Sequence, residues 1–106
     1  MHRAIFITCP SKKEARTIAR ELIKRKLAAC VNIIDRVESL FWWQGNVDSA
    51  KEVLLMVKSK KALFPRIVRA VKSKHSYDVP EIIAVPIVDG FAPYLRWIDE
   101  SVRHTT

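Results

Sequence analysis

The sequence is poor in the residues that most often cross-link a chain or bend it sharply. Its 106 residues include only two cysteines and two glycines. The two dispersed cysteines, Cys9 and Cys30, are too few for the disulfide framework of a small secreted domain, and their spacing matches no zinc motif. With Gly45 and Gly90 as its glycines, the chain contains no glycine-rich loop for a nucleotide phosphate. These shortages exclude a disulfide scaffold and the common nucleotide-binding motifs.

Long apolar runs are absent as well. The longest uninterrupted ones, such as Val53–Val57, contain five residues, whereas a membrane helix needs about 20. The segment Met1–Ala4 leads directly into a strand-like stretch and does not resemble a secretion signal. We therefore expect a cytoplasmic protein that does not enter a membrane. Because no linker or repeat divides the chain, residues 1–106 are predicted to form a single domain.

Positive charge is what the chain has in excess. It carries 19 Lys and Arg against 11 Asp and Glu, a formal charge of +8, so anionic partners have to be considered. Many of the basic residues between positions 12 and 24 recur at helical spacing opposite apolar ones, which is typical of an amphipathic helix. Two interpretations stay open: a solvated helix face, or a basic surface that attracts nucleic acid or another anion.

Apolar periodicity predicts the order strand, helix, long strand, long strand, helix, strand and short final helix. The expected elements are a strand Arg3–Thr8, a helix from Ser11 to about Leu27, strands from about Ala29 to Trp43 and from Val47 to about Ser59, a helix from about Pro65, a strand Glu81–Val88 and a helix from Pro93. Ser11 and Glu14 have the spacing of a capping box at the first helix. The βαββαβ order predicts an α+β, ferredoxin-like sandwich with two helices on one face of an antiparallel sheet.

The two long strands are the most unusual feature. Val31–Trp43 and Val47–Lys58 meet at Gln44–Asn46, and each is about a dozen residues long, against roughly 5 or 6 for an ordinary strand. Such a hairpin extends beyond a domain of this size, and its end carries the apolar segment Leu40–Trp43. Because an exposed apolar patch of this kind calls for a partner, we expect copies of the chain to pair through these strands.

A candidate site follows from the expected topology. The right-handed crossover rule places Cys9, the aromatic end of the hairpin, His75 and Tyr77 at one end of the sheet and Cys30 at the other, so no disulfide is expected. A thiolate and an imidazole suit copper or zinc. The alternatives are a small buried apolar role for Cys9 and a surface or capping role for His75.

Two other function classes are disfavoured by missing features. Cys9 and His75 form a formal nucleophile pair, but no oxyanion loop accompanies them, so an enzyme is not predicted. An RNA-recognition motif shares the βαββαβ order, and the chain is basic. However, Val53–Val57 lacks the aromatic platform on which bases stack, so nucleic acid is not an expected partner.

Six segments of the chain recur in one known family. They are TCP at Thr8–Pro10, KLAACVN at Lys26–Asn32, SLFWWQG at Ser39–Gly45, EVLLMVKSK at Glu52–Lys60, HSYDVPEIIAVPI at His75–Ile87 and DGFAPYLRWI at Asp89–Ile98. Together, in this order and within residues 4–102, they resemble the CutA divalent-cation-tolerance family.

The resemblance implies a homotrimer of ferredoxin-like subunits whose long hairpins form sheets between subunits. It also implies a link to copper and other divalent metals, with the metal on Cys9 and His75. Lys74 stands where the family pattern has a second histidine. We therefore expect copper(II) or another divalent cation to bind weakly and no cofactor to be obligatory.

The resemblance further implies an inter-subunit cleft formed by Lys58, Tyr77 and Glu81, with Trp43 nearby. These side chains suit a small anionic or polar ligand. The alternative is a hydrogen-bond cluster that locks the trimer, since buried polar groups need partners in either case. The predicted function is thus a cytoplasmic trimeric protein of divalent metal tolerance. The alternatives are an RNA-binding module and a trimeric signalling scaffold without a direct metal role.

Overall fold

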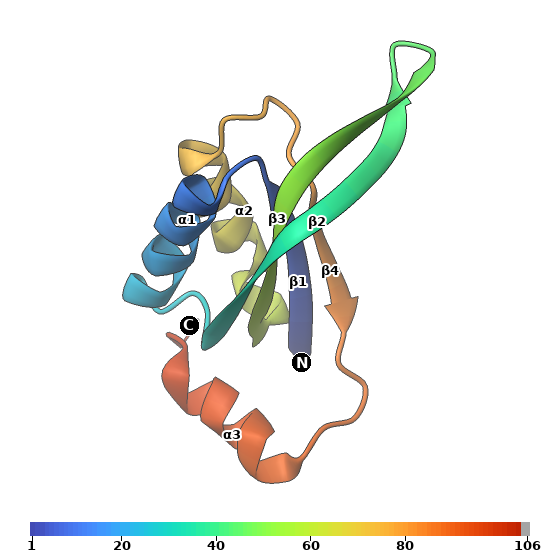
Figure 1. Ribbon diagram of the computed structural model, residues 1–106. Coiled ribbons are helices and arrows are strands. Elements are labelled where there is room, and N and C mark those ends of the chain that lie inside the picture. Colours follow the sequence, from blue (N-terminus) through green and yellow to red (C-terminus); the bar gives the residue numbers. More distant parts are fainter. Residues whose placement is uncertain (105–106) are drawn as a thin grey trace.

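The alternation of apolar residues along the central strands determines which face of the sheet is buried. In the computed structural model, which describes residues 1–104, the elements are β1 (His2–Cys9), α1 (Lys12–Lys24), β2 (Cys30–Trp43), β3 (Asn46–Lys60), the 3-10 turn η1 (Lys61–Leu63), α2 (Phe64–Lys74), β4 (Ile82–Pro86) and α3 (Ala92–Ser101). The strands form one antiparallel sheet in the order β2-β3-β1-β4, and α1 and α2 cover one of its faces (Figure 1). The predicted α+β architecture is confirmed at this level.

The core lies between that face and the two helices. Every second residue of β1 and β3 points into it, as the two-residue period of a strand requires. The buried side chains include Ile5, Ile7 and Cys9 of β1, Val53, Leu55 and Val57 of β3, Ala15, Ile18, Ala19 and Leu22 of α1, and Ile67, Ala70 and Val71 of α2. No helix in the described residues is both long enough and apolar enough to span a membrane.

The long hairpin is confirmed. β2 has 14 residues and β3 has 15, and the pair projects well beyond the rest of the sheet (Figure 1). Gln44 and Gly45 form the two-residue turn with φ angles of 50° and 83°. Positive φ at both positions is the signature of a type I′ turn, whose twist matches that of the paired strands. Leu40 and Trp42 near the tip are 70% and 75% exposed.

A β-bulge in β2 was not predicted. Ile34 pairs with Leu54 and Val37 with Glu52, so that Asp35 and Arg36 together lie opposite a single residue of β3. Arg36 adopts a φ of 63°, and its N–H donates to the Asp35 carboxylate at 2.7 Å. Because a bulge increases the local twist of a strand, it marks the point where the hairpin turns away from the sheet.

The first helix ends earlier than predicted, at Lys24 instead of Leu27. Lys26 adopts a φ of 56°, its N–H donates to the Ile23 carbonyl, and the Leu27 N–H donates to the Leu22 carbonyl. These two bonds define a Schellman cap, in which glycine is the usual residue at the left-handed position. Because this position is Lys26 and not a glycine, the sequence does not indicate that the helix ends here.

The C-terminal part of the chain contains a shorter strand than predicted and the expected final helix. β4 covers Ile82–Pro86, whereas Glu81–Val88 was expected. The last helix, α3, lies beyond the end of the sheet near the N-terminus rather than over its face (Figure 1). Its Ile98 is fully buried, but Tyr94 and Trp97 remain 41% and 43% exposed.

Candidate metal site

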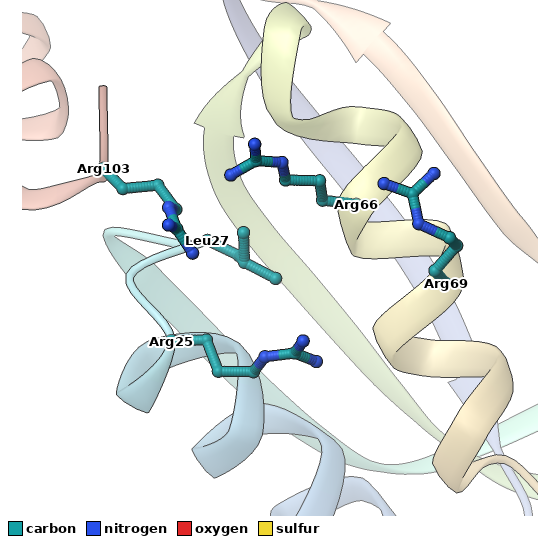
Figure 2. A pocket seen from close by; sticks show the side chains of 5 residues that line it. All are labelled: Arg25, Leu27, Arg66, Arg69 and Arg103. Carbon is teal, nitrogen blue, oxygen red and sulfur yellow. The ribbon is translucent and has the colours of Figure 1, made fainter. Parts of the chain in front are cut away.

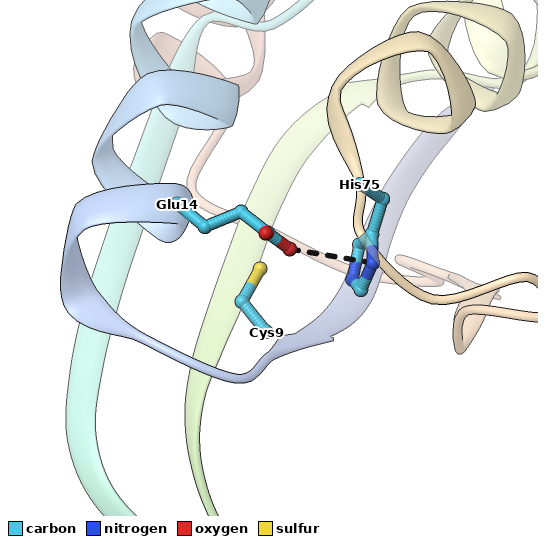
Figure 3. Close-up of side chains that lie close together, drawn as sticks. All are labelled: Cys9, Glu14 and His75. Atoms are coloured by element: carbon cyan, nitrogen blue, oxygen red, sulfur yellow. Dashed lines mark ion pairs between the residues drawn. The ribbon is translucent and has the colours of Figure 1, made fainter.

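Three elements, two of them consecutive in the chain and the third about 60 residues further on, bring a thiol, a carboxylate and an imidazole together. Cys9 is the last residue of β1, Glu14 lies in the first turn of α1, and His75 caps the C-terminal end of α2. One ligand atom from each lies within 4.8 Å of the others (Figure 3). The predicted proximity of Cys9 and His75 is therefore present in the structure, whereas the contribution of Glu14 was not predicted.

Cys9 is completely shielded from solvent. Burial raises the pKa of its thiol from 9.0 to about 12, and the negative charges of Glu14 and Glu52 act in the same direction. Both effects disfavour a thiolate because neither a low-dielectric environment nor a nearby carboxylate stabilises a second negative charge. At neutral pH Cys9 is a neutral thiol, which makes it a poor nucleophile and leaves a proton to be displaced by any metal.

The imidazole of His75 is fixed from both sides. Its Nε2 lies 2.7 Å from the Thr8 carbonyl oxygen, and the Tyr77 N–H points at its Nδ1 over 3.1 Å. A carbonyl can only accept a hydrogen bond, so Nε2 carries the ring proton and Nδ1 is the acceptor. The lone pair of Nδ1 is thus occupied by the Tyr77 N–H, and a carboxylate oxygen of Glu14 lies 3.4 Å from the same nitrogen.

Glu14 serves the opposite loop rather than its own helix. The Ser11 hydroxyl accepts a hydrogen bond from the Glu14 N–H at 3.2 Å, as a helix N-cap does. The Glu14 carboxylate, however, accepts from the N–H and the hydroxyl of Ser76, each at 3.2 Å. The capping-box pattern therefore gave the correct helix start but the wrong role for this carboxylate.

A hydrogen-bonded pair of a tyrosine and a buried glutamate lies beside the cluster. The Tyr77 hydroxyl donates to a carboxylate oxygen of Glu52 at 3.0 Å, and Glu52 is only 8% exposed. Burial raises the pKa of Tyr77 to about 12, and its hydrogen bond to Glu52 adds to this effect. Glu52 lies in β3 next to Val53, which pairs with Cys9 of β1. The hydrogen bond from Tyr77 to Glu52 therefore connects the cluster to the base of the projecting hairpin.

The other predicted cleft residues lie apart from one another within a single chain. Lys58 pairs with Ala4 and Cys30 toward the opposite end of the sheet, and its ammonium group donates to the Asn32 side chain. Trp43 lies at the tip of the hairpin and is 59% exposed. Glu81 is exposed immediately before β4. A shared cleft of Trp43, Lys58, Tyr77 and Glu81 therefore requires a second copy of the chain and stays a prediction.

The two cysteines are both free, with Cys9 and Cys30 at opposite ends of the sheet as expected.

A nitrogen, a sulfur and a carboxylate oxygen form a donor set that suits copper or zinc. Metal bonds of about 2.0–2.3 Å place tetrahedral ligand atoms roughly 3.3–3.8 Å apart. The observed spacing of up to 4.8 Å would therefore have to contract by about 1 Å to hold a metal ion.

Comparison with known proteins agrees with this description. The family model of the CutA1 divalent ion tolerance protein matches residues 3–101. This chain belongs to the CutA1 family. The resemblance carried by the six sequence segments is thereby confirmed. The family is named for tolerance to divalent ions and not for a catalysed reaction.

Relatives occur in several domains of life. The divalent-cation tolerance protein CutA of Archaeoglobus fulgidus is 46% identical over 103 residues, which are 97% of this chain and 100% of that protein. The mouse Protein CutA is 42% identical over 97 residues, covering 92% of this chain but only 55% of the mouse protein. The chain thus spans about half the length of the mouse relative and the full length of the archaeal one.

Solved structures of relatives share the fold. The divalent cation tolerance protein of Thermus thermophilus superimposes with a TM-score of 0.95 at 45% identity, covering 97% of this chain and 100% of that one. CutA1 of Oryza sativa gives a TM-score of 0.95 at 40% identity, covering 98% and 95%. The A. fulgidus protein is described as periplasmic. The cytoplasmic location of this chain stays a prediction.

Proposed function

We propose that this protein acts in divalent metal tolerance by binding copper or another divalent cation through Cys9, Glu14 and His75. The observation that supports this proposal is the convergence of these three ligand types, from three separate elements, within 4.8 Å. Membership in a divalent ion tolerance family also supports a role with divalent ions. We expect binding to be weak and exchangeable, as suits a response protein rather than a structural metal site.

The reason for weak binding lies in what each residue gives up. Cys9 must lose a proton from a thiol whose pKa is raised to about 12. His75 must exchange the hydrogen bond between its Nδ1 and the Tyr77 N–H for the cation. Glu14 is already a carboxylate held by Ser76 and needs only to turn. Lys74, where the family pattern has a second histidine, is exposed at the end of α2 and adds no ligand.

We further propose that the subunits are ferredoxin-like and assemble as a homotrimer through the long hairpins. The overhang of β2 and β3 and the exposed Leu40, Trp42 and Trp43 support an assembly of copies. In such a trimer, Lys58, Tyr77 and Glu81 from neighbouring subunits form the inter-subunit cleft for a small ligand. Light scattering at micromolar concentration should give a mass three times that of the 12.2 kDa chain, and a stable single-chain particle would contradict both the trimer and the cleft.

Metal titration tests the site itself. Isothermal titration with Cu²⁺ and with Zn²⁺ should give one site per chain, and Cys9→Ser, His75→Ala and Glu14→Gln should each weaken it by at least tenfold while light scattering shows an unchanged mass. The matched control is Cys30→Ser, which removes the other cysteine at the far end of the sheet. Unchanged affinity in Cys9→Ser, or an equal loss in Cys30→Ser, would remove Cys9 from the site.

A further inference from the structure

A concave site lies on the helical side of the molecule, away from the metal site. It is a hollow of about 290 Å³ lined by Leu27 and four arginines, Arg25, Arg66, Arg69 and Arg103 (Figure 2). We refer to it as the arginine pocket. Arg25 follows the end of α1, about 16 Å along the helix axis from Glu14 at 1.5 Å per residue. The arginine pocket and the metal site therefore occupy opposite ends of α1.

Backbone contacts hold the lining of the arginine pocket in place. Arg25 is the C-cap residue of α1, and the Schellman cap after it buries Leu27 as the floor. The N–H of Arg103 donates to the Lys26 carbonyl at 2.8 Å, which fastens the segment after α3 to the same turn. Arg66 and Arg69 lie on successive turns of α2. Three distant parts of the sequence thus present their arginines to one hollow.

The arginine pocket has a surplus of positive charge. The guanidinium of Arg25 is 3.6 Å from the carboxylate of Glu21. Within residues 1–104, no carboxylate lies within 4.0 Å of the guanidinium groups of Arg66, Arg69 or Arg103. Like charges gathered around one concavity repel one another, so an anion that enters it relieves this repulsion.

We propose that the arginine pocket binds a small soluble anion that carries two or more phosphate groups. Guanidinium groups bind phosphate through paired, charge-assisted hydrogen bonds, and several of them can share the oxygens of one polyphosphate. The volume of about 290 Å³ is at the lower end for ligand sites, which favours a compact anion over a large cofactor. Because this pocket shares no residue with the metal site, the proposal stands independently of metal binding.

The probe for the test is inorganic pyrophosphate, titrated calorimetrically into the full chain at low ionic strength, with inorganic phosphate in parallel. We expect pyrophosphate to bind more tightly than phosphate, and Arg66→Gln and Arg103→Gln each to weaken it by about tenfold, as expected for a lost charge-assisted bond. All four arginines are exposed, so these variants should keep the fold. The control Arg16→Gln removes one exposed positive charge from α1 outside the pocket and should change the affinity less than about twofold, as a screened surface charge does.

Two comparisons separate a shaped site from general attraction to a basic protein. Arg66→Lys keeps the charge but loses the planar fork, so it should bind pyrophosphate more weakly than the wild type; full affinity in Arg66→Lys, or equal losses in Arg16→Gln, would overturn the proposal. Single-stranded oligonucleotides should bind no more tightly as they lengthen, and pyrophosphate should displace them. If affinity rises with oligonucleotide length and pyrophosphate does not displace the oligonucleotides, the arginines form a nucleic-acid-binding surface and the proposal of a small-anion site is wrong.

Discussion

Cys9 should make the protein progressively less stable in alkaline solution. Its folded pKa is raised from 9.0 to about 12, so the folded state holds the proton more tightly than the unfolded chain does. The stability that this provides is fully present below pH 9 and is lost as the pH rises toward 12. The folded and unfolded pKa values differ by about three pH units, and each unit corresponds to about 1.4 kcal/mol, which gives a total on the order of 4 kcal/mol. Over this window the free energy of unfolding should fall by roughly 1.4 kcal/mol per pH unit because of Cys9 alone.

The assay is urea unfolding followed by far-ultraviolet circular dichroism at pH 8, 9, 10 and 11. Protein concentration has to be constant because assembly of copies would add to the apparent stability. The wild type is compared with Cys9→Ala, which removes the thiol, and with Cys30→Ala, which leaves Cys9 in place. Above pH 9, the free energy of unfolding of Cys9→Ala should fall with pH less steeply than that of the other two proteins, by about 1.4 kcal/mol per pH unit.

Tyr77 also has a pKa raised to about 12, but it is present in all three proteins and cancels in the comparison, apart from the smallest part of its shift, which the charge of Cys9 causes. Parallel curves for the wild type and Cys9→Ala would refute the reasoning. They would mean that the thiol of Cys9 is not shielded as the structure shows, and the expected cost of deprotonating it for a metal would disappear as well.

Three further substitutions test local features through the free energy of unfolding in urea. Lys26→Gly should stabilise the protein by about 1 kcal/mol, because glycine adopts the left-handed cap of α1 without steric cost; no gain would mean that this φ of 56° is not strained. Gly45→Ala should destabilise by about 1 kcal/mol through its φ of 83° alone, since nothing lies within 4 Å of the added Cβ, and an unchanged midpoint would argue against the type I′ turn. Tyr77→Phe should destabilise by about 1–3 kcal/mol because the buried carboxylate of Glu52 loses its donor. If the penalty disappears when Tyr77→Phe is combined with Glu52→Gln, the lost hydrogen bond is its cause. A neutral Tyr77→Phe would mean that this bond contributes nothing to stability.

The sequence predicted those parts of the fold that depend on a repeating pattern. Two-residue alternation identified β1 and β3, and the long apolar arms around Gly45 identified the hairpin. The same topology correctly placed His75 beside the end of β1, because the direction of each crossover follows from the strand order. The cytoplasmic location, the trimer and the cleft depend on other molecules, so a single chain does not test them.

The parts that were missed depend on single residues in conformations that their type does not favour. Lys26 and Arg36 both have positive φ, where glycine or asparagine would have been the recognisable signal. The end of α1 and the bulge in β2 were therefore absent from the prediction. Glu14 was assigned to its own helix because the pattern is local, whereas its carboxylate binds Ser76, 62 residues away. The arginine pocket combines three distant segments that no spacing rule connects.

The clamped imidazole has a consequence for which ions the proposed metal site would accept. The ring is already aimed, so an arriving ion does not have to order it, but the ion must compensate for the displaced bond from the Tyr77 N–H. Hard ions such as Mg²⁺ and Ca²⁺ gain little from nitrogen or sulfur and cannot recover that cost, whereas Cu²⁺ and Zn²⁺ can. At the proposed metal site, two ordinary hydrogen bonds on one histidine would thus act as a selectivity filter against Mg²⁺ and Ca²⁺.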